Sequence, residues 1–170
     1  MKNEVISMQT GTIAVELNQG GNHQCGTNPQ NQNKQDTQTL LELAKVRGWG
    51  TGVVTTTRIT HATPASTYAH ICHRDAENDI ASPLVPSSQG DIYQRYNVKL
   101  KDGVDVILGG GKRQFLPKDQ GGERIDQRNS IAEMQQAGYR IVYDQTQLSQ
   151  MKLGKNEKLL GLFNTSNLSY

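Results

Sequence analysis

The chain has 170 residues and carries 18 Lys and Arg against 16 Asp and Glu, which gives a formal net charge of +2. This near-balance offers no electrostatic argument for a nucleic acid or an anionic membrane as partner. The chain has only one tryptophan, six tyrosines and two phenylalanines, which argues against a platform for base stacking. Hydrophobic residues make up 34% of the chain, which suffices for the core of one domain or of part of one.

The N-terminal part of the chain is predicted to be mostly loop. Residues 1–8 lack the apolar core of a secretory signal peptide. Residues 17–35 have a polar, turn-rich composition that predicts a polar loop insertion. The apolar residues 12–15 predict a short strand or the end of a helix. No apolar run in the chain approaches the roughly 18 residues that a membrane span requires, so no span is expected.

Regular structure is predicted to begin with a helix and a strand. Asp36 is a good N-cap for a helix over residues 37–47, in which Leu40, Leu43 and Ala44 share an apolar face. Gly48 suits the position just after that helix. A buried strand is predicted over residues 53–57 because most of its residues are β-branched.

Helices and strands continue to alternate toward the C-terminus. The pattern predicts helices over residues 91–97, 130–137 and 145–150 and strands over residues 104–108, 139–143 and 159–163. Strands that alternate with helices form parallel sheets. The predicted fold class is therefore α/β, with a mostly parallel sheet flanked by helices.

The segment richest in chemistry covers residues 55–65 (TTTRITHATPA), where the first strand ends. Thr63 and Pro64 suit the N-cap and the first position of a following helix. Open α/β sheets bind ligands at the carboxyl ends of their strands, and a helix N-terminus favours an anion. His61 and Thr63 therefore stand where a metal or a phosphate would bind, while a simple cap and a loop histidine explain the same residues without a ligand.

Three further features carry weaker chemical signals. His70 and His73 are three residues apart and would share a helix face, but no third metal ligand accompanies them. Arg74 has a guanidinium suited to bidentate phosphate binding, and an isolated arginine equally suits a surface ion pair. The three glycines at 109–111 follow a strand but lack both the Walker and the GxGxxG spacing, so a strand-to-loop turn is the simpler interpretation.

Several blocks of the sequence together resemble the alkaline phosphatases. They are residues 52–65 (GVVTTTRITHATPA) with the following YAH and RD, residues 104–111 (VDVILGGG) and residues 159–163 (LLGLF). The blocks occur in the family's order, and the resemblance covers nearly the whole chain. It implies that residues 1–170 form a single partial alkaline-phosphatase-like domain.

The resemblance also implies an activity and a set of site residues. The family hydrolyses phosphate monoesters with a serine nucleophile, two Zn²⁺ ions and usually one Mg²⁺ ion. Carried over by position, Thr63 would ligate magnesium, His61 would lie beside the magnesium site, and Arg74 would bind the phosphate. Magnesium prefers oxygen ligands and a bidentate arginine stabilises charge on a phosphoryl group, which agrees with these roles. A homodimer and a periplasmic or extracellular location are implied in the same way.

The chain departs from the family pattern in what it lacks. Its 170 residues contain no Asp-Ser-Ala, the motif that carries the family's nucleophile, and the zinc ligands have no counterparts here. We therefore expect an internal segment that is inactive by itself. The alternative is a non-catalytic remnant or binding module that retains part of the fold. Cys25 and Cys72 are too few for a disulfide framework and leave both a single bridge and two thiols open.

Overall fold

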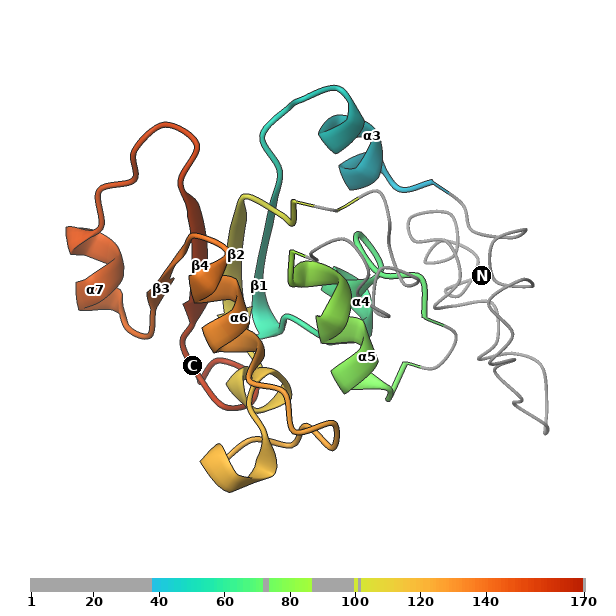
Figure 1. Cartoon of the computed structure of the whole chain (residues 1–170), viewed down its shortest axis with the longest axis vertical. Coiled ribbons are helices and arrows are strands. Elements are labelled where there is room, and N and C mark those ends of the chain that lie inside the picture. Colours follow the sequence, from blue (N-terminus) through green and yellow to red (C-terminus); the bar gives the residue numbers. More distant parts are fainter. Residues whose placement is uncertain (1–37, 72–73, 87–99, 101, 170) are drawn as a thin grey trace.

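A four-stranded parallel sheet organises the part of the chain that the computed structural model describes, which is residues 38–71, 74–86, 100 and 102–169 (Figure 1). All three strand pairings are parallel, and the strand order is β1-β2-β4-β3. The strands are β1 (Gly52–Arg58), β2 (Val106–Gly110), β3 (Tyr139–Val142) and β4 (Lys158–Leu162). The predicted α/β class and its parallel sheet are thus confirmed.

Short helices flank this sheet. They are α3 (Leu40–Val46), α4 (Ala62–Ala65), α5 (Glu77–Ala81), α6 (Ser130–Gln136) and α7 (Gln145–Gln150), with 3-10 turns η3 (Ser82–Leu84), η6 (Lys112–Phe115) and η7 (Lys118–Gln120). Helix α6 packs against β3, α4 contacts β1, and α5 contacts η6. Within the described residues, no helix combines the length and the apolar character of a membrane span.

Four predictions fall on parts of the chain outside the described residues. They are the polar loop insertion at 17–35, the apolar stretch at 12–15, the helix at 91–97 and the state of Cys25 and Cys72. The helices predicted over residues 130–137 and 145–150 are confirmed as α6 and α7. The sequence did not predict α5, and its five residues are too few to show a helical period.

Helix α3 begins later than the sequence predicted. Its N-cap is Thr39, whose hydroxyl accepts a hydrogen bond from the backbone N–H of Glu42 at 3.1 Å. The Glu42 carboxylate accepts in return from the backbone N–H of Thr39 at 2.8 Å. This reciprocal pair satisfies two N–H groups at the helix start, which explains why the helix begins at Leu40. The prediction that the apolar face is buried is wrong at Leu40, which is 83% exposed, while Leu43 and Ala44 are half-buried and Glu42 is fully buried.

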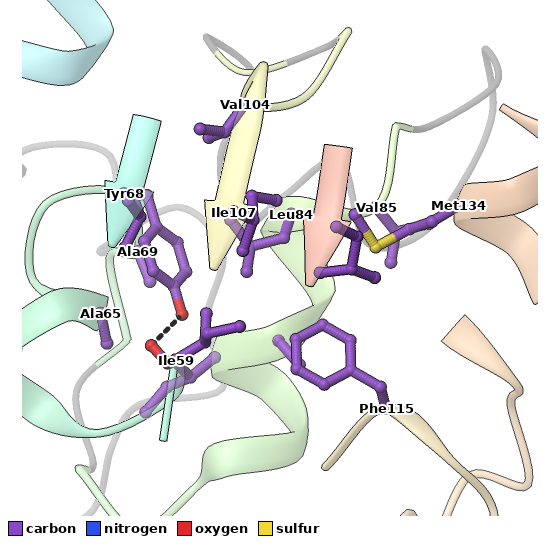
Figure 2. Close-up of a cluster of buried hydrophobic side chains, with 14 of the residues drawn as sticks. Ile59, Ala65, Tyr68, Ala69, Leu84, Val85, Val104, Ile107, Phe115 and Met134 are labelled. Atoms are coloured by element: carbon purple, nitrogen blue, oxygen red, sulfur yellow. Dashed lines mark hydrogen bonds between the residues drawn. The ribbon is translucent and has the colours of Figure 1, made fainter. Parts of the chain in front are cut away.

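The hydrophobic core joins the sheet to the segments around it (Figure 2). Its fully buried members come from distant parts of the chain and include Ile59 after β1, Ile80 in α5, Ile107 in β2, Phe115 in η6 and Met134 in α6. Burying a side chain of this size stabilises the fold by about 1.5–3 kcal/mol. The core therefore fixes α5 and η6 against the sheet, next to the carboxyl end of β1.

The run of three glycines at the end of β2 lets the C-terminal segment approach the sheet closely. A Cβ atom at Gly110 would lie 2.0 Å from the carbonyl oxygen of Ser166, which leaves room for glycine alone. The next N–H groups donate to that segment, Gly111 to Ser166 at 2.9 Å and Lys112 to Asn164 at 3.1 Å. Because these N–H groups bond within the protein, the structure supports a turn here and not a phosphate loop.

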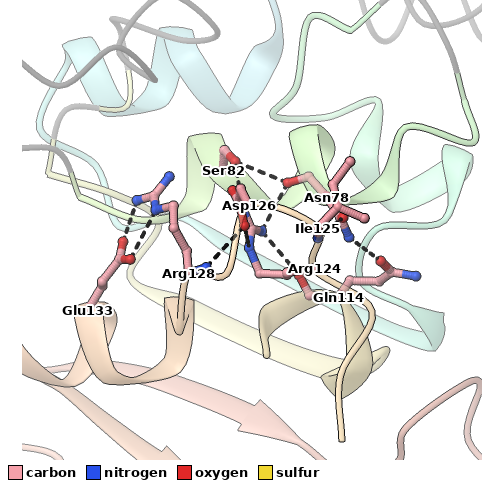
Figure 3. Close-up of polar contacts among 8 residues, drawn as sticks. All are labelled: Asn78, Ser82, Gln114, Arg124, Ile125, Asp126, Arg128 and Glu133. Carbon is pink, nitrogen blue, oxygen red and sulfur yellow. Dashed lines mark hydrogen bonds and ion pairs between the residues drawn. The ribbon is translucent and has the colours of Figure 1, made fainter. Parts of the chain in front are cut away.

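A buried arginine connects three segments that are distant in the sequence (Figure 3). The Arg124 side chain is 1% exposed and pairs with Asp126 at N–O distances of 3.0 and 2.5 Å. Its Nη1 donates to the backbone carbonyls of Asn78 at 3.0 Å and Gln114 at 3.1 Å. Arg124 therefore ties α5 and η6 to the loop that precedes α6.

We expect Arg124→Met to lower the free energy of unfolding by about 3 kcal/mol, because it removes the donor from the carbonyls of Asn78 and Gln114 and the cation from a partly buried ion pair. Urea unfolding followed by circular dichroism measures the loss. The control is Arg140→Met, since Arg140 is 55% exposed and lies 3.7 Å from Glu157. That variant should lose less than about 1 kcal/mol. Equal losses in the two variants would contradict the role assigned to Arg124.

Candidate functional site

The carboxyl end of β1 runs directly into α4 and carries the predicted residues His61 and Thr63. The N-cap of α4 is His61, whose carbonyl accepts from the backbone N–H of Ala65 at 3.0 Å. The prediction that Thr63 caps this helix is therefore wrong, and Thr63 and Pro64 lie inside the first turn. Proline fits there because the first N–H groups of a helix have no acceptor within the helix.

The hydroxyl of Thr63 is available to a ligand. Thr63 is exposed, and its hydroxyl forms no hydrogen bond within the described part of the chain. It lines a groove of about 720 Å³ between α3, β1 and α4, together with Leu41, Val53 and Pro64. An oxygen in this position fits a Mg²⁺ ion as one ligand among several.

The described residues do not complete a metal site by themselves. They contain no group of three or more His, Cys, Asp or Glu side chains placed to hold a metal ion. Thr63 therefore fits magnesium only as a single oxygen ligand. For zinc, which is bound by histidine, cysteine and carboxylate side chains, the described residues do not fit.

His61 presents a neutral ring with an unsatisfied nitrogen. Its Nδ1 is buried and has no hydrogen-bond partner among the described residues. Burial lowers the pKa of His61, and the positive charges of Arg58 and Arg74 lower the pKa further against the opposing effect of Glu77. The neutral imidazole can accept a hydrogen bond from a water molecule or a ligand at this site. The positive charge of Arg74 therefore acts on His61.

Arg74 has no partner for its donors among the described residues. It is half-buried in a turn, and its guanidinium forms no hydrogen bond or ion pair with the described residues. The alternative interpretation as a surface ion pair thus finds no partner there. A guanidinium without a carboxylate partner retains the planar fork of N–H groups that matches a phosphate. No hydrogen bond joins Arg74 to Thr63. The charge of Arg74 acts on His61, whereas Thr63 lines the groove between α3, β1 and α4.

The sequence patterns did not single out Arg58, Thr60 and Glu77, which form a polar cluster beside His61. Arg58 donates to the Glu77 carboxylate over distances of 2.8 to 3.1 Å. The Thr60 hydroxyl donates to the same carboxylate at 2.5 Å. Burial would raise the pKa of Glu77, but the hydrogen bonds from Arg58 and Thr60 outweigh it and lower the pKa. The one signal in the sequence that could have pointed to this cluster is Arg58, a charged residue within the segment 55–65 at the end of β1.

The metal pair considered for His70 and His73 is not supported by the surroundings of His70. His70 is buried, and its Nε2 lies 2.8 Å from Oε1 of Glu42 in α3. The chain is not helical at residues 66–71, so the predicted shared helix face does not exist there. His73 lies outside the described residues.

The hydroxyl of Tyr68, which is fully buried, donates to the Ile59 carbonyl at 3.0 Å and ties this segment to the end of β1 (Figure 2).

The chain belongs to the alkaline phosphatase family, whose model matches residues 5–170. It is 41% identical over 128 residues to alkaline phosphatase 3 of Bacillus subtilis (strain 168), a match that covers 75% of this chain and 23% of that protein. The chain spans about a quarter of the length of the curated relatives it matches. The predicted family resemblance is thus confirmed.

Solved structures support the same assignment. The cold-active alkaline phosphatase from Shewanella sp. superimposes with a TM-score of 0.64 at 26% identity, covering 98% of this chain and 32% of that one. A histidine-to-aspartate variant of alkaline phosphatase from the Antarctic bacterium TAB5 was solved with bound magnesium. It matches with a TM-score of 0.56 at 25% identity, covering 79% of this chain and 33% of that one.

We expect acid to remove the stabilisation that Glu77 provides. Because hydrogen bonds lower its pKa in the folded chain below the ordinary 4.5, the unfolded chain binds the proton first. The stabilisation is therefore fully present above about pH 4.5 and is lost as the pH falls through the folded pKa. Thermal unfolding of the wild type and of Glu77→Gln from about pH 7 to about pH 3 should show a stability difference that shrinks toward acid. A constant difference would count against this account.

Proposed function

We propose that this chain is a segment of an alkaline phosphatase that hydrolyses phosphate monoesters, and that Arg74 binds the phosphate. The observation that carries the proposal is the Arg74 guanidinium, which forms no hydrogen bond or ion pair with the described residues and whose charge lowers the pKa of His61 after β1. Open α/β sheets bind their ligands at that edge. Membership of the alkaline phosphatase family supports this class of reaction.

The chemistry of Arg74 suits both the bound substrate and its reaction. Its N–H groups can donate two parallel hydrogen bonds to phosphate oxygens, which orients the phosphoryl group as well as binding it. Negative charge spreads over these oxygens during phosphoryl transfer, and a fixed guanidinium stabilises it. Because no described carboxylate pairs with Arg74, a phosphate does not have to displace one.

We assign Thr63 to magnesium and His61 to the surroundings of that ion. The free hydroxyl of Thr63 supplies one oxygen ligand, and the unpartnered Nδ1 of His61 can accept a hydrogen bond from a water molecule on the ion. A magnesium ion bound there would contribute positive charge close to the phosphate. The related TAB5 alkaline phosphatase binds magnesium in its solved histidine-to-aspartate variant, which supports magnesium as the ion.

The serine nucleophile and the two zinc ions belong, in this proposal, to parts of the phosphatase outside these 170 residues. The chain contains no Asp-Ser-Ala, so we propose that it is inactive by itself. A homodimer and a periplasmic or extracellular location are further proposals that rest on the family resemblance. A non-catalytic remnant that retains part of the fold is the alternative that an activity assay must exclude.

Hydrolysis of p-nitrophenyl phosphate at alkaline pH, with Zn²⁺ and Mg²⁺ present, tests the role of Arg74. The 170-residue chain alone should show no turnover, while the complete phosphatase that contains it should be active. In that enzyme, we expect Arg74→Ala to raise the inhibition constant of inorganic phosphate about a hundredfold, because the bidentate contact is lost. Arg140→Ala serves as the control at an exposed arginine. An unchanged inhibition constant in Arg74→Ala would rule out the assignment.

Magnesium titration of the complete enzyme tests the role of Thr63. Thr63→Val removes the hydroxyl at nearly constant volume, and we expect it to raise the Mg²⁺ concentration for half-maximal activation at least about tenfold. Thr63→Ser keeps the hydroxyl and should restore most of the magnesium affinity. Equal magnesium dependence in the valine and serine variants would show that the hydroxyl is not a ligand.

A further inference from the structure

The turn that carries Arg74 is followed at once by α5, whose first residue is Glu77. The Glu77 carboxylate reaches back to the carboxyl end of β1, where it accepts from Arg58 and Thr60. Thr60 immediately precedes His61 in the chain. One carboxylate therefore joins the segment that carries Arg74 to the segment that carries His61 and Thr63.

We propose that Glu77 is a positioning residue, which holds the Arg74 turn against the end of β1 and so sets where the Arg74 guanidinium stands relative to His61 and Thr63. The inference rests on the proposed function, because it matters only if Arg74 binds phosphate. Glu77 itself touches neither substrate nor metal in this account. It acts through the backbone that it shares with Arg74, three residues away.

The geometry of the contact makes it a stiff connection. The guanidinium of Arg58 meets Glu77 through both Nε and Nη2, which fixes the relative orientation of the two groups as well as their distance. The side chains of Arg58 and Glu77 are only 19% and 13% exposed, so water competes weakly for these bonds. Arg58 is held in turn by Asn167, whose Oδ1 accepts from its backbone N–H at 2.9 Å.

The other side of α5 is fixed independently of Glu77. Asn78, the next residue, donates through its side-chain amide to Gln114 at 2.7 Å, and its carbonyl accepts from the buried Arg124 (Figure 3). Helix α5 is therefore anchored to η6 and to the loop before α6. The Glu77 contact determines how this anchored helix meets β1, and Arg74 lies in the turn just before that contact.

The charge of Glu77 has a second consequence for Arg74. Its hydrogen bonds to Arg58 raise the pKa of that guanidinium and use its donors. Arg58 is thereby occupied, while Arg74 forms no ion pair within the described residues. Of these two arginines near His61, Arg74 is the one that retains free donors for a phosphate.

A double-mutant cycle on the complete phosphatase tests the inference. The four proteins are the wild type, Glu77→Gln, Arg74→Ala and the combination of both, and the probe is inorganic phosphate as an inhibitor. We expect Glu77→Gln to raise the phosphate inhibition constant about tenfold or more, because a displaced Arg74 contacts the phosphate poorly. In the Arg74→Ala background, the same change should alter the constant by less than about twofold. A merely structural role would lower the amount of active enzyme and leave this constant unchanged.

The control is Glu133→Gln, which removes the carboxylate from another Arg–Glu pair, that of Arg128 and Glu133 in α6, with side chains 17% and 33% exposed. It should leave phosphate inhibition unchanged. Should Glu77→Gln fail to fold, Arg58→Lys, which keeps the charge and loses the bidentate fork, replaces it in the cycle.

The outcomes separate the two proposals. If Arg74→Ala weakens phosphate binding and Glu77→Gln does not, or if Glu77→Gln acts equally in both backgrounds, the positioning role is wrong and the proposed function stands. If the complete protein shows no hydrolysis, or Arg74→Ala leaves phosphate inhibition unchanged, the proposed function fails and this inference fails with it.

Discussion

The parallel pairing of β1 with β2 determines where the candidate site can be. In a parallel sheet all carboxyl ends lie along one edge, so the ends of β1 and β2 come together. The three glycines at the end of β2 let the C-terminal segment pack into that edge, which brings Asn167 to Arg58 at the end of β1. The same edge receives α4 and α5, and hence His61, Thr63 and Arg74. The site therefore depends on strand pairing between residues more than fifty positions apart in the chain.

Three arginines around that edge differ in whether their guanidinium groups are paired within the described part of the protein. Arg58 is paired with Glu77, and Arg124 is paired with Asp126 and bonded to backbone carbonyls. Arg74 forms no such bond with the described residues, although it is the one that follows the family motif. A buried or half-buried arginine whose donors are satisfied stabilises the fold, whereas an unsatisfied one is available to an anion. This contrast is the physical basis for assigning the phosphate to Arg74.

The contacts around Arg124, α5 and Glu77 lie within a chain that belongs to the alkaline phosphatase family. A chain that spans about a quarter of its curated relatives nevertheless contains a continuous set of contacts from the core, through Arg124 and α5, to Glu77 and the turn with Arg74. Such a set places the proposed phosphate-binding residue Arg74 and the proposed magnesium ligand Thr63 on a common support. Within the described residues it does not include a group of three or more His, Cys, Asp or Glu side chains that could hold a metal ion. This agrees with the proposal that the chain is one segment of a larger phosphatase.

The sequence alone determined the α/β class, four strands, α6, α7 and the strand-end motif, because β-branched runs, apolar periodicity and family motifs are local signals. The capping box of Thr39 and Glu42 that starts α3 is also a local pattern, which the prediction of Asp36 as N-cap overlooked. Only the structure decided that His61 rather than Thr63 caps α4 and that Glu77 binds Arg58. The Arg58–Glu77 contact joins residues 19 positions apart, and Arg124 reaches Asn78 across 46 positions. No local pattern encodes such pairs, since they exist only after the sheet and core have brought the segments together.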